Sequence, residues 1–437
     1  MKIKAKKHLG FIIFLIIILV FPVSLSYQAR LNMRIIVTGL AIDKIDNEYQ
    51  VTAQIVKTIP GSKPPGTSAE IDFLVDRSKV LSEAVSKLAY KAGKVSAFSH
   101  TNFIIVGKSV LEEDISKCLD YFVRDKVIKN SALLLFAEDS AGDELQKTKK
   151  TELSVGIGLQ KVYTFKERNS DGLMVTIIDF LKNSKSNTGT SVASTLALET
   201  NKEQQSSSGS SGGEGDSSSG SGSGSGEQGS SSSGGSSGSG SSSGEGGSSG
   251  GGSSGGEEYQ YFKQNGPLMC FVDGRFAGKI ESEDDVSGFM LAHNKSKVIE
   301  VTLSDVSGGR FHNDQVEIAI RNKNNKFKIS YQGDVPVLEV LVTITKSEIG
   351  EILSDKIIGT LTEEEYGLLV QKLKEEISKK VTACFETAKG FGVDIFNAYD
   401  YAYKYKYKNT TNKYSDKTQF LNDVQIKVSV DIKQMDY

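Results

Sequence analysis

Residues 362–390 read TEEEYGLLVQKLKEEISKKVTACFETAKG, and they decide the fold of the second half of the chain. Thr362 followed by Glu365 is the pattern of a capping box, in which two side chains satisfy backbone N–H groups at a helix start. Apolar side chains then recur at helical spacing, at Leu369, Leu373, Ile377, Val381 and Ala388. Gly390 is a typical helix end. The stretch therefore predicts a long helix over about 362–389 with one buried face.

Strand patterns surround this helix and predict an α+β region over residues 265–437, with room for two subdomains. The expected strands are 268–272, 276–280, 298–303, 316–320, 327–331, 335–345 and 424–432. Asp273-Gly274 predicts a tight hairpin turn between the first two strands, and Asn324-Asn325 predicts a turn between 316–320 and 327–331. Residues 281–288 (ESEDDVSG) favour an acidic, solvated turn, and residues 395–405 a second helix.

The first half of the chain alternates between strand and helix patterns over residues 27–200. The expected strands are 34–42, 49–59, 102–106 and 131–137, and the expected helices are 78–92, 115–123 and 171–182. Residues 43–47 (DKIDN) predict a hairpin turn after the first strand. Alternating strands and helices are typical of a layered α/β-type domain. The whole fold class is thus expected to be α+β, with several domains of mixed sheets and packed helices.

An apolar run, LGFIIFLIIILVFPV, spans residues 9–23 and follows four lysines. Its expected membrane-facing residues include Leu9, Phe11, Ile16, Leu19, Phe21 and Val23. Positive charge stays on the cytoplasmic side, so the body after this run should be extracytoplasmic. The run is short for a span, and Ser24 and Ser26 fit a cleavage site. Residues 1–26 therefore form either a retained anchor, which we favour, or a removable signal peptide.

Residues 201–264 interrupt the two patterned halves with a tract of serine and glycine. Such a composition buries too little apolar surface to offset its ordering entropy. We expect a disordered segment, acting either as a linker between domains or as an insertion in a surface loop.

Composition and motifs argue against most catalytic chemistry. The formal net charge is −2, which gives no reason to expect a nucleic-acid partner. Cys118, Cys270 and Cys384 are far apart and lack metal-ligand spacing, so we interpret them as small buried hydrophobes. His100 stands at the mouth of a buried strand with no carboxylate at motif spacing, which favours a structural histidine over a general base. We expect no catalytic residue, no cofactor and no metal.

A ladder of tyrosines alternates with lysines near the end of the chain, at Tyr399, Tyr401, Tyr403, Tyr405 and Tyr407 with Lys404, Lys406 and Lys408. Stacking on nucleic acid is one interpretation. Amphipathic packing, or a position near a membrane interface, fits an extracytoplasmic protein without net positive charge better.

Four stretches together resemble one known family. They are RIIVTGLAID (34–43), SEAVSKLAYKAGKVSAFSHTNFIIVGKSVLEEDISKCLDYFVRD (82–125), PLMCFVDGRFAGKIE (267–281) and FGVDIFNAYDYAYKYK (391–406). The pattern is similar to the Ger(x)C family, the C subunits of GerA-type spore germinant receptors. The resemblance marks as structural motif residues Gly39, Asp43, His100, Gly107, Arg124, Gly274, Gly278, Gly392 and Asp394.

The resemblance implies a non-enzymatic accessory subunit, an α+β body on the outer face of the spore's inner membrane. Its implied partners are polytopic membrane subunits that sense amino acids or sugars, and any contact of this chain with a nutrient would be indirect. Family members usually carry a lipobox Cys before the first strand. Here that place reads SLSYQARLNMR (24–34), so no lipidation is expected and residues 9–23 would anchor the protein.

Two other functions stay open from the sequence. One is a cell-surface adhesin or solute-binding module displayed on the Ser/Gly tract as a flexible stalk. The other is an unrecognised hydrolase that uses His100.

Overall fold

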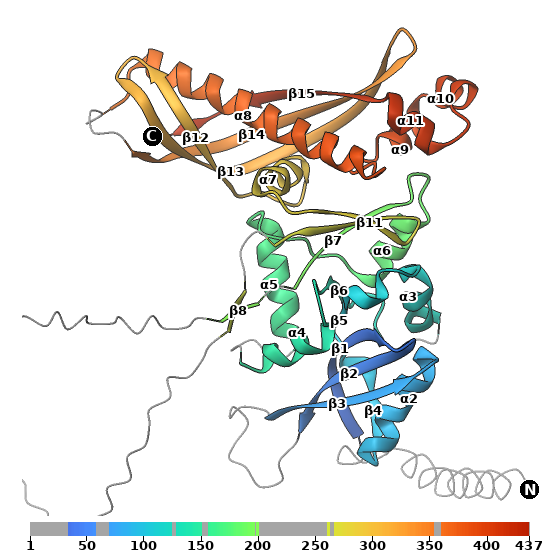
Figure 1. The fold of residues 1–437 in the computed structure, drawn as a ribbon. Coiled ribbons are helices and arrows are strands. Elements are labelled where there is room, and N and C mark those ends of the chain that lie inside the picture. Colours follow the sequence, from blue (N-terminus) through green and yellow to red (C-terminus); the bar gives the residue numbers. More distant parts are fainter. Residues whose placement is uncertain are drawn as a thin grey trace, which may run out of the picture. The chain divides into compact units, whose positions relative to one another are not determined.

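The computed structural model describes residues 34–57, 70–124, 128–150, 156–196, 198–200, 260–262, 266–353 and 360–436. Within these ranges it contains ten α-helices and mixed sheets (Figure 1), so the expected α+β class is confirmed. The apolar run and the Ser/Gly tract lie outside the described residues, and the predictions for them stay predictions. The domain boundaries proposed above stay predictions too.

A mixed sheet with strand order β3-β2-β1-β5-β6 organises the first half. Its strands are β1 (Arg34–Ile45), β2 (Glu48–Lys57), β3 (Glu70–Ser78), β4 (Val95–Ala97), β5 (Phe103–Val106) and β6 (Leu133–Phe136). β1, β2 and β3 pair antiparallel, whereas β5 joins β1 and β6 in parallel. Asp46 and Asn47 turn the β1–β2 hairpin with positive φ, as the DKIDN pattern predicts.

Five α-helices accompany this sheet in the described part of the first half. They are α2 (Leu81–Ala92), α3 (Ile115–Arg124), α4 (Ala141–Lys147), α5 (Gly156–Arg168) and α6 (Ile177–Ser184), with short 3-10 turns η2 (Phe98–His100), η3 (Lys108–Val110) and η4 (Thr148–Lys150). The helix predicted over 171–182 forms, but it begins at Ile177 and not at Asp171. Thr176 caps the helix through a bond from the N–H of Asp179. The sequence analysis missed β3, α4 and α5 altogether.

A three-stranded sheet contains chain from both sides of the Ser/Gly tract. β7 (Thr190–Ser194) pairs antiparallel with β10 (Leu268–Val272), which forms the predicted hairpin with β11 (Arg275–Ile280). Two short strands, β8 (Leu198–Thr200) and β9 (Gln260–Phe262), pair next to the tract. Phe271 of β10 contacts Phe136 and Phe180, with ring centroids 4.7 and 5.1 Å away. Residues before and after the tract therefore share one core.

The last part of the chain forms a second large sheet with strand order β12-β13-β14-β15, and a fifth strand, β16, pairs with β14. Its elements are α7 (Glu283–Ala292), β12 (Ile299–Gly308), β13 (Phe311–Gln332), β14 (Val335–Leu353), α8 (Glu363–Gly390), α9 (Ala398–Tyr405), α10 (Tyr407–Lys413), α11 (Lys417–Asp423), β15 (Gln425–Ile432) and β16 (Met435–Asp436). The closing strand β15 pairs in parallel with β14 and is half-exposed, as predicted.

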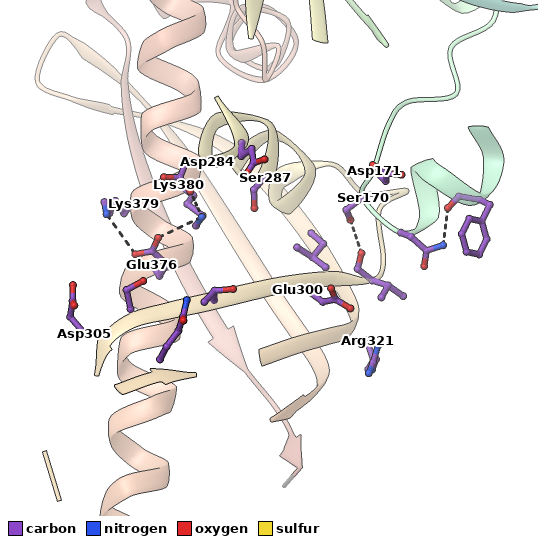
Figure 2. Close-up of a pocket in the computed structure, with 18 residues that line it drawn as sticks. Ser170, Asp171, Asp284, Ser287, Glu300, Asp305, Arg321, Glu376, Lys379 and Lys380 are labelled. Carbon is purple, nitrogen blue, oxygen red and sulfur yellow. Dashed lines mark hydrogen bonds and ion pairs between the residues drawn. The ribbon is translucent and has the colours of Figure 1, made fainter. Parts of the chain in front are cut away.

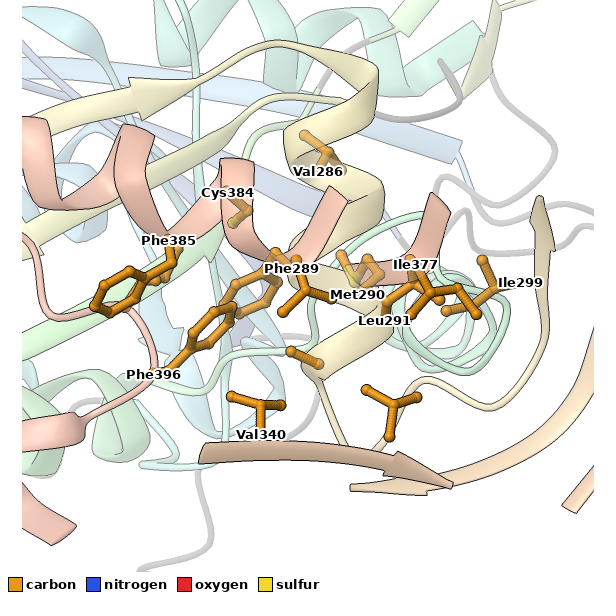
Figure 3. Close-up of a cluster of buried hydrophobic side chains, with 14 of the residues drawn as sticks. Val286, Phe289, Met290, Leu291, Ile299, Val340, Ile377, Cys384, Phe385 and Phe396 are labelled. Carbon is orange, nitrogen blue, oxygen red and sulfur yellow. The ribbon is translucent and has the colours of Figure 1, made fainter. Parts of the chain in front are cut away.

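Helix α8 forms as its sequence predicts. Thr362 and Glu365 complete the capping box, and Arg310 of the β12–β13 hairpin donates from its Nε to Glu365 Oε1 at 2.8 Å. The buried face of α8 meets α7 over the sheet, where Phe289, Phe385 and other apolar side chains interdigitate (Figure 3). The long helix thus binds the sheet and α7 into one core.

Two turn predictions in this half were wrong. Asn324 and Asn325 lie inside the single long strand β13, opposite Thr343 and Val342. The turn comes later, at Gly333, whose φ is 61°. Residues 283–292 form helix α7 instead of an acidic turn, because Glu283, Asp284 and Asp285 occupy its first turn, where the helix dipole favours negative charge.

Candidate functional site

Asp43 and Gly107, two of the family-motif residues, meet at the start of α4. Asp43 is buried, and its two carboxylate oxygens accept the backbone N–H groups of Ala141 and Gly142, each at 2.8 Å. A Cβ at Gly107 would overlap Asp43 Oδ1. Burial raises the pKa of Asp43, and the two backbone N–H bonds act against that rise. The carboxylate therefore holds α4 to the end of β1 and is not free for chemistry.

Asp394 repeats this arrangement in the second half. Its side chain is buried and accepts the N–H groups of Ala398 and Tyr399, each at 2.7 Å, at the start of α9. Burial raises the pKa of Asp394 to about 6. Gly392 precedes it with φ 73°, a conformation that favours glycine. The carboxylate of Asp394 therefore holds the start of α9 in place, as that of Asp43 does for α4.

Three other motif glycines allow close approaches. The buried ring of Phe103 covers Gly39, its partner across β1 and β5. Phe391 covers Gly278, and Gly274 turns the β10–β11 hairpin with φ 81° against Ser116. These glycines leave room for packing and do not line a cavity with the two aspartates.

His100 and Arg124 lie apart from those motif residues and are exposed. His100 ends η2, and Arg124 ends α3, where it pairs with Asp120 at 3.5 Å. The nine motif residues are therefore placed around the fold and do not gather into one site. Among the described residues, no cluster of three or more His, Cys, Asp or Glu side chains is arranged to hold a metal ion.

A polar groove of about 880 Å³ runs along strand β12 (Figure 2). We call it the β12 groove. Its walls are the end of α5 with its following loop, the start of α7, the middle of α8, β12 itself, and Gln315 and Arg321 of β13. Its β12 residues are Ile299, Glu300, Thr302, Ser304 and Asp305, and Val298 lines it just before the strand.

β12 is an edge strand of its sheet. It pairs with β13 on one side, and no described strand pairs with its other side. Side chains alternate across a strand, yet the neighbours Ile299 and Glu300 both line the groove although Ile299 is buried. We infer that the backbone edge itself faces the groove.

One end of this edge is already occupied. Arg168, the last residue of α5, accepts through its carbonyl the N–H groups of Lys297 and Val298, at 2.9 and 3.0 Å. Ser170 donates its hydroxyl to the carbonyl of Val298 at 2.8 Å. The free part of the edge therefore begins at Ile299.

The groove carries more negative than positive charge. Lys380 pairs with Asp284 and lies 3.7 Å from Glu376, and Arg321 pairs with Glu348 outside the groove at 2.8 Å. The exposed carboxylates of Glu283, Glu300 and Asp305 form no ion pair with any described residue. The groove thus lies beside a strand edge that no described strand covers, with three negative charges that pair with no described cation.

A buried lysine lies in β13, near the loop between α7 and β12. Lys323 of β13 is 1% exposed, and its ammonium donates to the carbonyl of His293 at 2.7 Å. Burial, and secondarily the charge of Lys297, lowers the pKa of Lys323 to about 7. The ring of His293 lies 3.4 Å from Glu167 of α5.

The three cysteines are free and buried, as interpreted from the sequence. Burial raises the pKa of Cys118 and of Cys270 to about 12. No helix in the described parts of the chain is both long and apolar enough to cross a membrane.

The β12 groove has no signal in the sequence. The alternation around Glu300 and Thr302 indicates a half-exposed strand, but nothing local shows that this strand is at a sheet edge. Its other walls come from Ser170, Glu283 and Glu376, which are far apart in the chain.

Comparison with known proteins gives two family matches. Residues 27–198 match the family described as spore germination protein N-terminal domain, and residues 268–435 match spore germination B3/GerAC like, C-terminal. Spore germination protein B3 of Bacillus subtilis (strain 168) is 29% identical over 113 residues, which cover 25% of this chain and 29% of that relative. The crystal structure of the GerBC protein is similar with a TM-score of 0.49 and 11% identity, over 91% of this chain and 97% of that one.

Proposed function

Because the chain belongs to the Ger(x)C family of spore germination proteins, we propose that it is a non-enzymatic accessory subunit of a membrane nutrient germinant receptor. Two family matches support this proposal, one on each side of the Ser/Gly tract. The buried carboxylates Asp43 and Asp394 support a non-catalytic role, since backbone N–H groups of helix starts bind them.

In this proposal residues 9–23 anchor the chain, and its body lies on the extracytoplasmic side of the spore inner membrane. The partners are polytopic receptor subunits, and any nutrient, an amino acid or a sugar, is bound by the complex with this chain in an indirect role.

The β12 groove is our proposed contact with a partner subunit. A free strand edge binds an extended segment by adding it as a further strand, and backbone hydrogen bonds supply the affinity. Glu283, Glu300 and Asp305 favour a segment that carries lysine or arginine. The occupant is therefore an extended, basic segment of a polytopic partner.

The test is a pull-down from spore membranes with a tag at the C-terminus. The expected result is recovery of two multi-spanning proteins in near-equal amounts with the intact chain. The double charge reversal Glu300→Lys, Asp305→Lys should lower that recovery several-fold, because both side chains are exposed and line the groove.

The matched control reverses two exposed carboxylates outside the groove, Glu351→Lys and Glu386→Lys. It should leave recovery unchanged. Recovery of the intact chain without any multi-spanning protein would reject the receptor proposal. Equal recovery with the groove variant and its control would reject the groove as the contact and leave the receptor proposal standing.

A further inference from the structure

Helices α9 and α10 present an exposed surface of tyrosine and lysine. Residues 403–409 are all exposed, whereas Ala398, Ala402 and Thr410 form the buried side of the two helices. We call this the Tyr/Lys surface, and it consists of Tyr403, Lys404, Tyr405, Lys406, Tyr407 and Lys408.

Two of the tyrosine rings on this surface are largely open to solvent. Tyr405 is 61% exposed and Tyr407 is 53% exposed, while Tyr163 and Tyr414 elsewhere in the chain are 2% and 5% exposed. The rings contact one another, with Tyr403 and Tyr407 centroids 5.0 Å apart. The rings therefore pack against one another, while the rest of each ring faces solvent.

The charge of this segment is opposite to that of the whole protein. Residues 401–415 contain four lysines and no Asp or Glu, in a chain of net charge −2. Lys404, Lys406 and Lys408 are exposed and form no ion pair with any residue in the described ranges. The ammonium of Lys404 lies 5.1 Å from the ring centroid of Tyr405.

We propose that the Tyr/Lys surface docks on a bilayer that contains anionic lipids. Tyrosine places an apolar ring at the acyl boundary and its hydroxyl in water, and lysine extends its ammonium to the lipid phosphates. Short helices with one buried and one aromatic, basic side can lie in the plane of such an interface. The attraction of lysines to anionic headgroups supplies the charge complementarity. This contact is separate from residues 9–23 and does not rest on the receptor proposal.

The absence of tryptophan from the chain allows a direct test. Tyr405→Trp introduces a single tryptophan on the Tyr/Lys surface. The full chain is reconstituted into phosphatidylcholine vesicles with brominated acyl chains, with and without phosphatidylglycerol. Bromine quenches tryptophan emission only at short range, so quenching reports contact with the acyl boundary.

The control variant is Phe165→Trp, at a side chain that is 69% exposed on α5. Any tether through residues 9–23 is the same in both variants. We expect strong quenching of Trp emission in the Tyr405→Trp chain with phosphatidylglycerol, little without it, and little for the control in either vesicle. Adding Lys404→Gln, Lys406→Gln and Lys408→Gln should remove most of the quenching, as should high salt.

The proposal is overturned if the Tyr405→Trp chain is quenched no more than the control, or equally with and without phosphatidylglycerol. Protection of its tryptophan by added nucleic acid or by an acidic protein, with no response to vesicles, would assign the surface to that partner instead. Circular dichroism and cooperative urea unfolding of each variant show that a negative result does not come from misfolding.

Discussion

Replacing Lys323 by methionine should change how the stability of the protein depends on pH. The substitution keeps the apolar length of the side chain and removes the buried amine. In the wild-type chain that amine is 1% exposed, bonds the carbonyl of His293, and has a pKa lowered to about 7 by burial and by Lys297. In the unfolded chain the same lysine titrates near its ordinary pKa of about 10.4.

The sign and size of the effect follow from proton binding. Between pH 7 and pH 9 the unfolded chain keeps the proton on Lys323, while the folded chain goes from half protonated to almost fully deprotonated. Stability rises with pH wherever the unfolded state binds more protons. At about 1.4 kcal/mol per pH unit, and with the folded lysine half protonated at pH 7, this lysine should add about 2 kcal/mol to the free energy of unfolding of the wild-type chain between pH 7 and pH 9.

The assay is urea unfolding of the wild-type and Lys323→Met chains at pH 7 and pH 9. The free energy of unfolding of the variant minus that of the wild type should fall by about 2 kcal/mol between the two pH values. The buried thiols, whose pKa values burial raises, titrate alike in both chains and cancel in this difference. The bond to the carbonyl of His293 is donated by the titrating amine itself, so its change with protonation is already contained in the lowered pKa of Lys323.

The exposed neighbour Lys326 supplies the control, since Lys326→Met should leave the difference from wild type constant with pH. A Lys323→Met difference that is also constant would show that Lys323 stays charged in the fold. The reasoning about its burial would then be refuted.

Gly39→Ala should lower the free energy of unfolding by about 1–3 kcal/mol, because its Cβ would overlap the buried ring of Phe103. Gly367→Ala should raise it by up to about 1 kcal/mol, because this glycine is exposed in α8 and its Cβ would meet nothing. Urea midpoints in the opposite order would contradict both expectations. Asp43→Ala should cost about 3 kcal/mol in the same assay, because it leaves two buried N–H groups at the start of α4 without acceptors, whereas a cost below about 0.5 kcal/mol would show that water replaces the carboxylate. The three cysteines should react with a thiol reagent only after unfolding, because all are buried, and rapid labelling of the native protein would contradict that burial.

The sequence by itself determined the elements whose causes are local. Helix α8 follows from the capping box of Thr362 and Glu365 and from apolar side chains one turn apart. The β10–β11 hairpin follows from Asp273-Gly274, whose backbone adopts the positive φ that the turn needs. In each case the interacting groups lie within a few residues of one another, so the pattern carries the information.

Only the tertiary structure decided which elements meet. Asn324-Asn325 has the composition of a turn but stays extended, because Asn325 bonds Leu291 and Asn294 in the α7 region. The carboxylate of Asp43 caps a helix that starts 98 residues later. The β12 groove exists because β12 is a sheet edge beside the end of α5 and the middle of α8, which are both far from it in the chain. Strand order and remote caps depend on the packing of whole elements, which no local pattern records.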